Sequence, residues 1–160
     1  MLSNTFKAYL MTTMAGLLGL WASCDNHPAA YQYCSTPIEG WEPGDTLKYK
    51  VDTLKASGVY DFSLGVRTSS STPYPYQSLW VVVYQQWHNP EQTMVDTVKL
   101  QLTNEWGDPQ GHGVTLYQFD QPWRKLPLVK GQWADIRITH IMRSEMLRGV
   151  SDVGICLQKE

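Results

Sequence analysis

The feature that most constrains this chain is a period-two alternation of apolar and polar residues in short segments. Residues 46–51 alternate three polar side chains with Leu47, Tyr49 and Val51. Similar alternation occurs in residues 58–67, 93–102 and 132–140. Successive side chains of a strand point to opposite faces, so this pattern is typical of strands with one buried face.

Further extended segments and turn signals complete the pattern. Residues 79–83 are five apolar residues in succession, which favours a central strand covered on both faces. Residues 114–119 and 150–158 also favour extended structure, whereas residues 68–76 and 104–113 are rich in turn formers. Seven or eight strands predict an all-β, antiparallel β-sandwich, with a jelly roll as a candidate topology and a barrel as the alternative.

Helix formers gather in one place only. Residues 141–148 include Met142, Arg143, Glu145, Met146 and Leu147, and Gly149 follows where a helix would stop. The sequence therefore predicts at most one short helix, near the C-terminus.

The N-terminus predicts export. Lys7 precedes a stretch without charge, residues 8–22, which at about 15 residues is shorter than the roughly 20 needed to span a bilayer. Ala22 and Ser23 stand before Cys24 as in a lipobox, although Trp21 occupies a position that is usually aliphatic. We interpret residues 1–23 as a lipoprotein signal peptide and Cys24 as the acylated first residue. The alternatives are an ordinary secretory signal or a cytoplasmic start that happens to be apolar.

The remaining 137 residues suffice for one domain. Residues 24–37 lack periodicity and are expected to form the acylated cysteine and a tether, with the β-sandwich domain over residues 38–160. Without Lys7, 12 Lys and Arg face 15 Asp and Glu, a net charge of −3 without blocks of one sign. This pattern argues against a nucleic-acid partner.

Two cysteines besides Cys24 need an interpretation. Cys34 and Cys156 lie near the two ends of the domain, and an oxidising envelope would let them pair if the first and last segments are neighbours in a sheet. The alternative is that Cys156, within an apolar run, is a buried thiol.

No catalytic pattern stands out. The sequence lacks a nucleophile elbow, an HExxH motif, a P-loop and a dinucleotide-binding fingerprint. The four histidines are scattered, and Glu105 and Asp108 fit a solvated turn better than a glycosidase pair. We predict no enzyme activity, no catalytic residue, no cofactor, no metal and no small-molecule substrate.

Aromatic residues are the best candidates for binding. Trp80 and Trp133 fall in predicted strands and favour the core. Trp87, Trp106 and Trp123 fall in predicted loops and are candidates for the surface. Arg67, Tyr74, Tyr76 and Trp80 flank or form the proline-rich segment and are a further candidate binding patch, or else part of a proline-braced turn.

The order of several motifs resembles a known family. They are Ile38-Glu39-Gly40-Trp41, the segment from Pro73 to Trp80, Met142-Arg143 and Asp152-Val153-Gly154-Ile155. Together they are similar to the gliding motility lipoprotein family GldH of Bacteroidota. The resemblance implies an envelope lipoprotein at the outer membrane that supports the gliding machinery and type IX secretion, and it implies no catalytic residues.

Two functions follow as hypotheses. The first is a non-enzymatic scaffold or assembly factor, acylated and membrane-bound, which docks onto other envelope proteins of the gliding and secretion machinery. The alternative is a carbohydrate-binding β-sandwich lipoprotein of an envelope glycan system, and a lipoprotein hydrolase is a third class. No acidic run follows Asp25, which favours a domain facing the periplasm.

Overall fold

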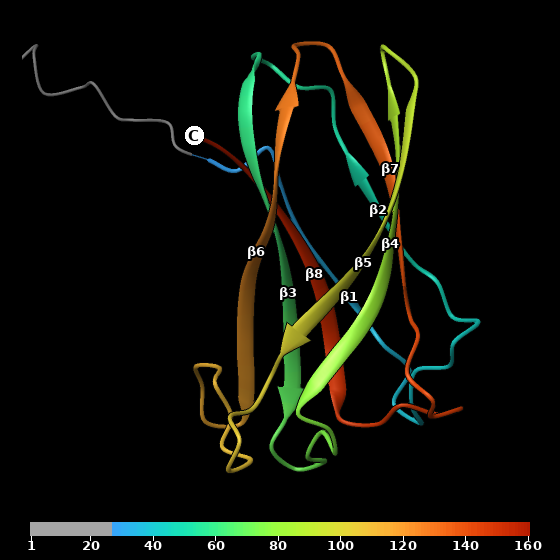
Figure 1. The fold of residues 1–160 in the computed structure, drawn as a ribbon, viewed down its shortest axis with the longest axis vertical. Coiled ribbons are helices and arrows are strands. Elements are labelled where there is room, and N and C mark those ends of the chain that lie inside the picture. Colours follow the sequence, from blue (N-terminus) through green and yellow to red (C-terminus); the bar gives the residue numbers. More distant parts are fainter. Residues whose placement is uncertain (1–26) are drawn as a thin grey trace, which may run out of the picture.

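A computed structural model describes residues 27–160, which form eight strands and contain no helix. The strands are β1 (Ala30–Ser35), β2 (Leu47–Val51), β3 (Gly58–Ser69), β4 (Ser78–His88), β5 (Gln92–Gln101), β6 (Leu116–Leu128), β7 (Trp133–His140) and β8 (Val150–Lys159). They build two antiparallel four-stranded sheets that pack face to face (Figure 1). The predicted all-β sandwich is confirmed.

The topology is that of a hairpin rolled up on itself. β4 pairs with β5, β3 with β6, β2 with β7 and β1 with β8, each pair nested inside the next. Rolling adds the pairs β3 with β8 and β4 with β7, which gives sheet orders β1-β8-β3-β6 and β2-β7-β4-β5. This nesting is the jelly roll that the sequence left as a candidate.

Side chains from both sheets fill one core. Alternate residues of each strand are buried, as the period-two pattern predicts, and the largest fully buried side chains include Trp41, Trp87 and Phe62. β4 is central and paired on both sides, but only one of its faces is covered, because no further layer lies outside its sheet. Trp80 and Tyr84 are therefore exposed, and the expectation that Trp80 belongs to the core is wrong.

Three segments differ from expectation. β1 lies inside the range 24–37 expected to be a tether, because β8 supplies a partner for all six of its residues. Residues 141–148 form an irregular segment with bends and no helix, because Trp41 and Leu147 exchange two backbone hydrogen bonds of 2.9 Å and tie Leu147 to the connection after β1. β6 continues through Pro122 and Pro127, which an edge strand tolerates. The predictions for residues 1–26, including Cys24, lie outside the described residues.

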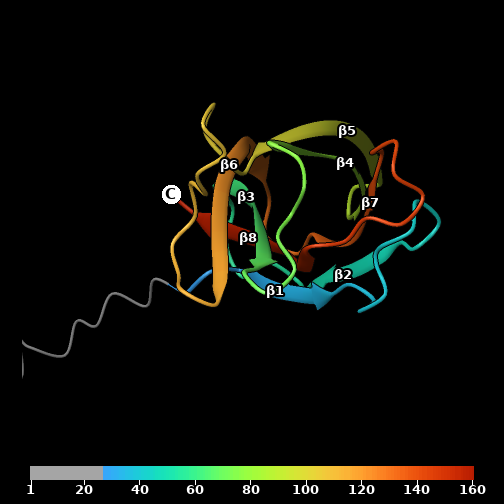
Figure 2. The ribbon, with the colours of Figure 1, turned by 90° about the horizontal axis from the view of Figure 1, so that it is seen from below.

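Two glutamine side chains close the long edges of the sandwich. Figure 2 shows β1 beside β2 and β6 beside β5, in different sheets. At the first edge, the Gln32 amide donates to the Lys50 carbonyl at 2.6 Å and faces the Lys50 N–H at 3.4 Å. At the second edge, Gln121 does the same with the Lys99 carbonyl (3.0 Å) and the Gln101 N–H (3.4 Å). Each amide thus imitates a backbone partner and partly satisfies an edge strand that would otherwise invite association.

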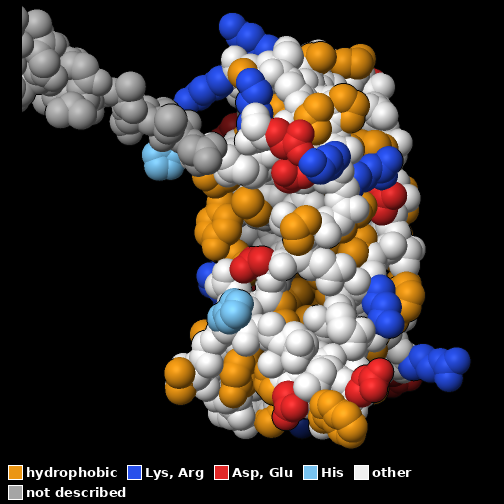
Figure 3. All heavy atoms as spheres, turned by 60° about the vertical axis from the view of Figure 1, so that its left-hand side comes forward, with side chains coloured by type: hydrophobic (Ala, Val, Ile, Leu, Met, Phe, Trp, Pro, Cys, Tyr) orange, Lys and Arg blue, Asp and Glu red, His pale blue; other side chains and the backbone are white. Residues whose placement is uncertain are grey.

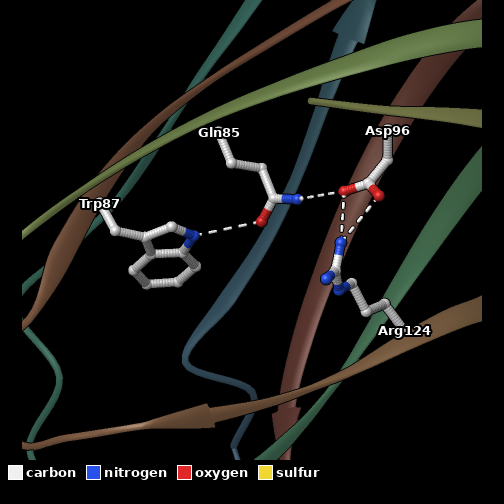
Figure 4. Close-up of polar contacts among 4 residues, drawn as sticks. All are labelled: Gln85, Trp87, Asp96 and Arg124. Atoms are coloured by element: carbon white, nitrogen blue, oxygen red, sulfur yellow. Dashed lines mark hydrogen bonds and ion pairs between the residues drawn. The ribbon is translucent and has the colours of Figure 1, made fainter. Parts of the chain in front are cut away.

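A polar chain runs from the core to the β5/β6 edge (Figure 4). The Trp87 indole N–H donates to Gln85 Oε1 at 3.1 Å, and both side chains are fully buried. Gln85 Nε2 donates to Asp96 at 3.2 Å, and Arg124 donates to both carboxylate oxygens of Asp96 at 2.6–2.7 Å. Each buried polar atom in this chain therefore has a partner, as a low-dielectric interior requires.

The two cysteines of the domain are free thiols. The first and last strands are neighbours, as a disulfide requires, but Cys34 pairs with Val153, whereas Cys156 pairs with Tyr31. Three residues along a strand separate the two positions by about 10 Å and turn them to opposite faces. Of the two possibilities that the sequence left open, the Cys34–Cys156 disulfide is therefore absent, and burial raises the pKa of the Cys156 thiol.

We predict that Gln85→Leu lowers the free energy of unfolding by about 1–3 kcal/mol, because it leaves the buried Trp87 N–H without an acceptor. Urea unfolding would measure the change. Gln86→Leu is the matched control, since Gln86 is the exposed neighbour on the same strand. Equal stability of the two variants would contradict the role given to Gln85.

Candidate docking site

The loops of the sandwich differ in length between its two ends. The turns after β2, β4 and β6 are short, at residues 52–57, 89–91 and 129–132. The connections after β1, β3, β5 and β7 are longer and gather at the opposite end, which we call the loop end (Figure 1). The chain begins its described part at the other end, the short-turn end, beside the C-terminus of β8.

The loop end exposes hydrophobic side chains. Several appear at the bottom of Figure 3. Exposed members on the long connections or the strand ends beside them are Ile38, Tyr76, Trp106, Val114, Leu116, Ile141 and Met146. Contiguous exposed apolar surface is typical of interaction sites, so a hollow at the loop end that joins such side chains is the candidate docking site.

An apolar hollow of about 440 Å³ lies where the loop end meets the outer face of sheet β2-β7-β4-β5. Tyr76, Trp80, Thr97, Ile141, Met142 and Arg143 line it. Tyr76 and Trp80 are 42% and 41% exposed, and Ile141 is 50% exposed. Tryptophan, tyrosine, methionine and arginine are the residues that protein interfaces favour at their centres, so the composition fits a docking site.

The strand backbone fixes two walls of the hollow. Ile141 donates its backbone N–H to the Trp80 carbonyl at 3.0 Å, which continues the pairing of β7 with β4. The Trp80 N–H points at the Met142 sulfur at 3.4 Å. These contacts hold Met142 beside Trp80, so the hollow is formed without any further movement of the chain.

Tyr74 supports Tyr76, the side chain that the loop after β3 contributes to the hollow. Its hydroxyl donates to the Ser78 carbonyl at 3.0 Å, and its ring meets that of Tyr76 edge to face at 5.7 Å. Its backbone lies so close to Gly149 that a Cβ there would be 2.6 Å from the Tyr74 Cα, and Gly149 has a φ of +89°, so only glycine fits. Burial raises the pKa of Tyr74, which stays a neutral donor.

His140 fixes the start of the 141–149 segment. It is 1% exposed, its Nε2 lies 2.9 Å from the Trp41 carbonyl, and its Nδ1 lies 3.2 Å from the Met142 N–H. A neutral ring that donates from Nε2 and accepts at Nδ1 satisfies both contacts. Burial lowers the pKa of His140, against the smaller opposing effects of the Trp41 carbonyl and Asp45.

Cations border the hollow and the sheet beside it. Lys99 lies 5.9 Å from the Trp80 ring, and Arg137 lies 5.8 Å from the Tyr84 ring. Arg143 is exposed on the rim of the hollow. These cation–π contacts hold positive charge over the aromatic face.

Trp106 stands apart, at the tip of a rigid turn. The Asn104 side-chain oxygen accepts from the Trp106 and Asp108 backbone N–H groups at 2.9 and 2.8 Å, and Asn104 Nδ2 donates to the Asp108 carboxylate at 3.0 Å. Asp108 is thus tied into a solvated turn. Trp106 is 86% exposed, which confirms its prediction as a surface residue.

The structure brings together only part of the predicted patch. Tyr76 and Trp80 line the hollow, and Tyr74 contacts the Tyr76 ring without lining it. Arg67 lies on the other sheet, 3.9 Å from the Tyr33 ring and 3.2 Å from Gln118. Its placement in the predicted patch is therefore wrong.

Two predicted surface tryptophans lie in strands. Trp87 is fully buried in β4, and the partly buried Trp123 packs against Phe62 at 5.3 Å. Both expectations of exposure are wrong, because β4 and β6 extend beyond the segments that the sequence assigned to them. The sequence interpretation also missed Ile141, Met142 and Arg143, because the composition of residues 141–148 predicted a helix where the chain is irregular.

Comparison with known proteins identifies the family. The family model described as GldH lipoprotein matches residues 29–157. The chain belongs to the GldH lipoprotein family. Membership in the GldH lipoprotein family makes it a gliding-motility-associated, lipid-anchored protein of the cell envelope. No curated protein matches the sequence.

Solved structures give weaker likenesses to this GldH lipoprotein domain. A family GH115 4-O-methyl-alpha-glucuronidase is 13% identical with a TM-score of 0.41, over 86% of this chain and 18% of that one. The Penaeus vannamei nodavirus P-domain is 10% identical with a TM-score of 0.29, over 84% and 99%. Latent PorU from Porphyromonas gingivalis is 9% identical with a TM-score of 0.30, over 87% and 14%. All three scores lie below 0.5, so these likenesses carry no functional argument.

We predict that acid destabilises this GldH lipoprotein domain through His140. Its pKa in the folded protein lies below the ordinary 6.5, so the unfolded chain takes up the proton first. Above about pH 6.5 the neutral ring contributes fully to the free energy of unfolding. This contribution is lost as the pH falls towards the pKa of His140 in the folded protein.

Urea unfolding at several pH values from neutral to acidic would measure this effect. His140→Gln should weaken the pH dependence, whereas His112→Gln, which removes an exposed histidine, should leave it unchanged. The role of His140 is refuted if the wild type and the His140→Gln protein lose stability in parallel.

Proposed function

We propose that this GldH lipoprotein is a non-enzymatic scaffold or assembly factor for the gliding and type IX secretion machinery of the envelope. The observation that carries the proposal is the preformed apolar hollow at Tyr76, Trp80 and Met142, with an arginine on its rim. A partner's apolar side chain would fill the hollow, as buried anchor residues do in protein interfaces.

The placement of the hollow supports this proposal. We propose Cys24 as the acylated residue, with the domain on the periplasmic side of the outer membrane. The described chain begins at the short-turn end, whereas the hollow lies at the loop end. A protein held by Cys24 would therefore offer the hollow to partners at a distance from its anchor.

Charge indicates the kind of partner. The four long connections carry six carboxylates and two arginines, a net −4. They are Glu39, Glu42, Asp45, Glu105, Asp108, Glu145, Arg143 and Arg148. Lys99 and Arg143 border the hollow itself, so a partner would complement this end by placing an apolar anchor in the hollow and basic groups against the acidic connections, since complementary charge sets specificity and association rate.

Trp106 keeps a second function open. An indole that is 86% exposed on a rigid turn can stack on a sugar ring, so carbohydrate binding is the alternative. A glycan array with the wild type and Trp106→Ala separates the two. Sugar binding that depends on Trp106 would favour the alternative, and no binding would favour the scaffold.

We predict that the double variant Tyr76→Ala with Trp80→Ala loses its protein partners. Truncating hot-spot aromatics costs about 2 kcal/mol or more each, so recovery of partners should fall roughly tenfold or more. Affinity purification of the tagged lipoprotein from its own envelope, followed by mass spectrometry, would measure it. Both residues are over 40% exposed, so the fold should persist.

Tyr31→Ala is the matched control, because Tyr31 is an exposed aromatic residue of the opposite sheet. It should retain all partners and normal secretion. The docking role of the hollow would be abandoned if the double variant recovers gliding and secretion components as well as the control does.

A further inference from the structure

The distance between the anchor and the folded domain is short. The Ala29 N–H already donates to the Leu157 carbonyl at 2.7 Å, so the sandwich begins five residues after Cys24. Five residues of extended chain span at most about 18 Å. β3 alone, with 12 residues, is about 40 Å long, so the short-turn end must lie close to the membrane that holds Cys24.

Lysines gather at this end. Lys55 lies in the turn after β2 and Lys130 in the turn after β6, and the two turns are joined by hydrogen bonds of 2.9 Å (Gly131 N–H to Leu54 carbonyl) and 2.8 Å (Lys130 N–H to Ser57 hydroxyl). The Lys159 side chain crosses Gly58, where a Cβ would meet its Cε at 2.6 Å. Lys and Arg side chains project at the top of Figure 3, which is this end.

The three ammonium groups are available to a ligand. The ion pairs among residues 27–160 involve other groups, namely His88 with Glu91 and Asp135, Arg124 with Asp96, and Lys125 with Asp61 and Glu160. The nearby Glu160 carboxylate is therefore already paired with Lys125. Two further acids belong to the short turns, Asp52 after β2 and Glu91 after β4, and Glu91 contacts His88 at 2.7 Å. All three lysines are exposed.

Charge also distinguishes this end from the rest of the molecule. The three short turns carry Lys55 and Lys130 against Asp52 and Glu91, a net charge of zero to which Lys159 of β8 adds, whereas the connections of the loop end carry −4. An anionic membrane would therefore repel the loop end. The outer face of sheet β2-β7-β4-β5 is also basic, with Lys48, Lys99 and Arg137, and β1 lies in the other sheet beside the edge strand β2. The test must therefore separate a domain that stands on its short-turn end from one that lies on this face.

We infer that the short-turn end is a membrane-contacting surface, on which Lys55, Lys130 and Lys159 bind the phosphates of anionic phospholipids. The domain then stands upright on its anchor, with the loop end outward. This rests on the proposed acylation of Cys24 and adds to it a second attachment and a fixed orientation. A lipid chain with a basic patch is a two-signal anchor, and each lysine near an anionic surface strengthens binding about fivefold.

The test is lysine footprinting of the full-length acylated protein. A membrane-impermeant amine acylating reagent is applied to the protein on the outside of vesicles and, as the reference, in neutral detergent micelles. The vesicles are phosphatidylcholine alone or an equimolar mixture with phosphatidylglycerol. Mass spectrometry then gives the reaction rate of each lysine.

On the anionic vesicles we expect Lys55, Lys130 and Lys159 to react about fivefold more slowly than in micelles. Lys48 and Lys99, exposed on the sheet face, are internal controls whose rates should not change. Phosphatidylcholine alone should protect the three lysines less, which separates phosphate contact from mere proximity. A Gly-Ser spacer of ten residues inserted between Asn26 and His27 should reduce the protection, because it lowers the effective concentration of the lipid.

Other outcomes would overturn the inference. Protection of Lys48 and Lys99 instead would show a domain lying on its sheet face, and equal rates in micelles and anionic vesicles would show no contact. Either result leaves the anchor intact if the protein still floats with the vesicles and carries the mass of its acyl chains. A protein without that mass that fails to float overturns the acylation of Cys24 and, with it, the contact.

Discussion

The pairing of β1 with β8 is the interaction on which the arrangement of this molecule depends. It places the beginning of the domain beside its end and closes the outermost pair of the nested hairpin. Because successive strands also alternate in direction, the short turns all fall at the end where the described part of the chain begins. The long connections all fall at the other end, so the proposed membrane side and the proposed docking side lie at opposite ends of the sandwich.

Side chains that substitute for missing backbone partners stabilise this arrangement. Gln32 and Gln121 each present an amide to an edge strand of the facing sheet, and Arg124 with Asp96 joins the same β5/β6 edge as Gln121. Gln85 donates a hydrogen bond to Asp96 and so extends these polar contacts into the core. The sandwich thereby protects its open edges, which leaves the loop end and the sheet face beside it as the surfaces for partners.

The strands could be predicted from sequence because their alternation is a local property. Residues 46–51 and 132–140 show the pattern directly, and β2 and β7 lie within them. What the sequence could not give was any feature set by a distant partner. β1 is a strand because β8 pairs with it, and residues 141–148 are irregular instead of helical because Trp41 bonds to Leu147.

In the candidate site, too, the residues with a local signal could be predicted and those placed by a distant partner could not. Tyr76 and Trp80 were predicted from a local signal, the aromatic residues of a proline-rich segment. The sequence placed Trp87 in a loop because composition does not show where a strand ends and the following loop begins. Met142 contributes to the hollow only because it lies beside Trp80, 62 residues away in the chain. A hollow built from two strands and two loops has no signature in any one segment.

Photo-cross-linking in the native envelope tests the central claim, that the hollow faces a protein partner, most directly. A photoreactive amino acid replaces Trp80 in one strain and Tyr31 in another. The claim predicts that the probe at position 80 cross-links to a component of the gliding or secretion machinery and that the probe at position 31 does not. Cross-links to lipid or to no protein from position 80, with normal accumulation of the lipoprotein, would contradict it.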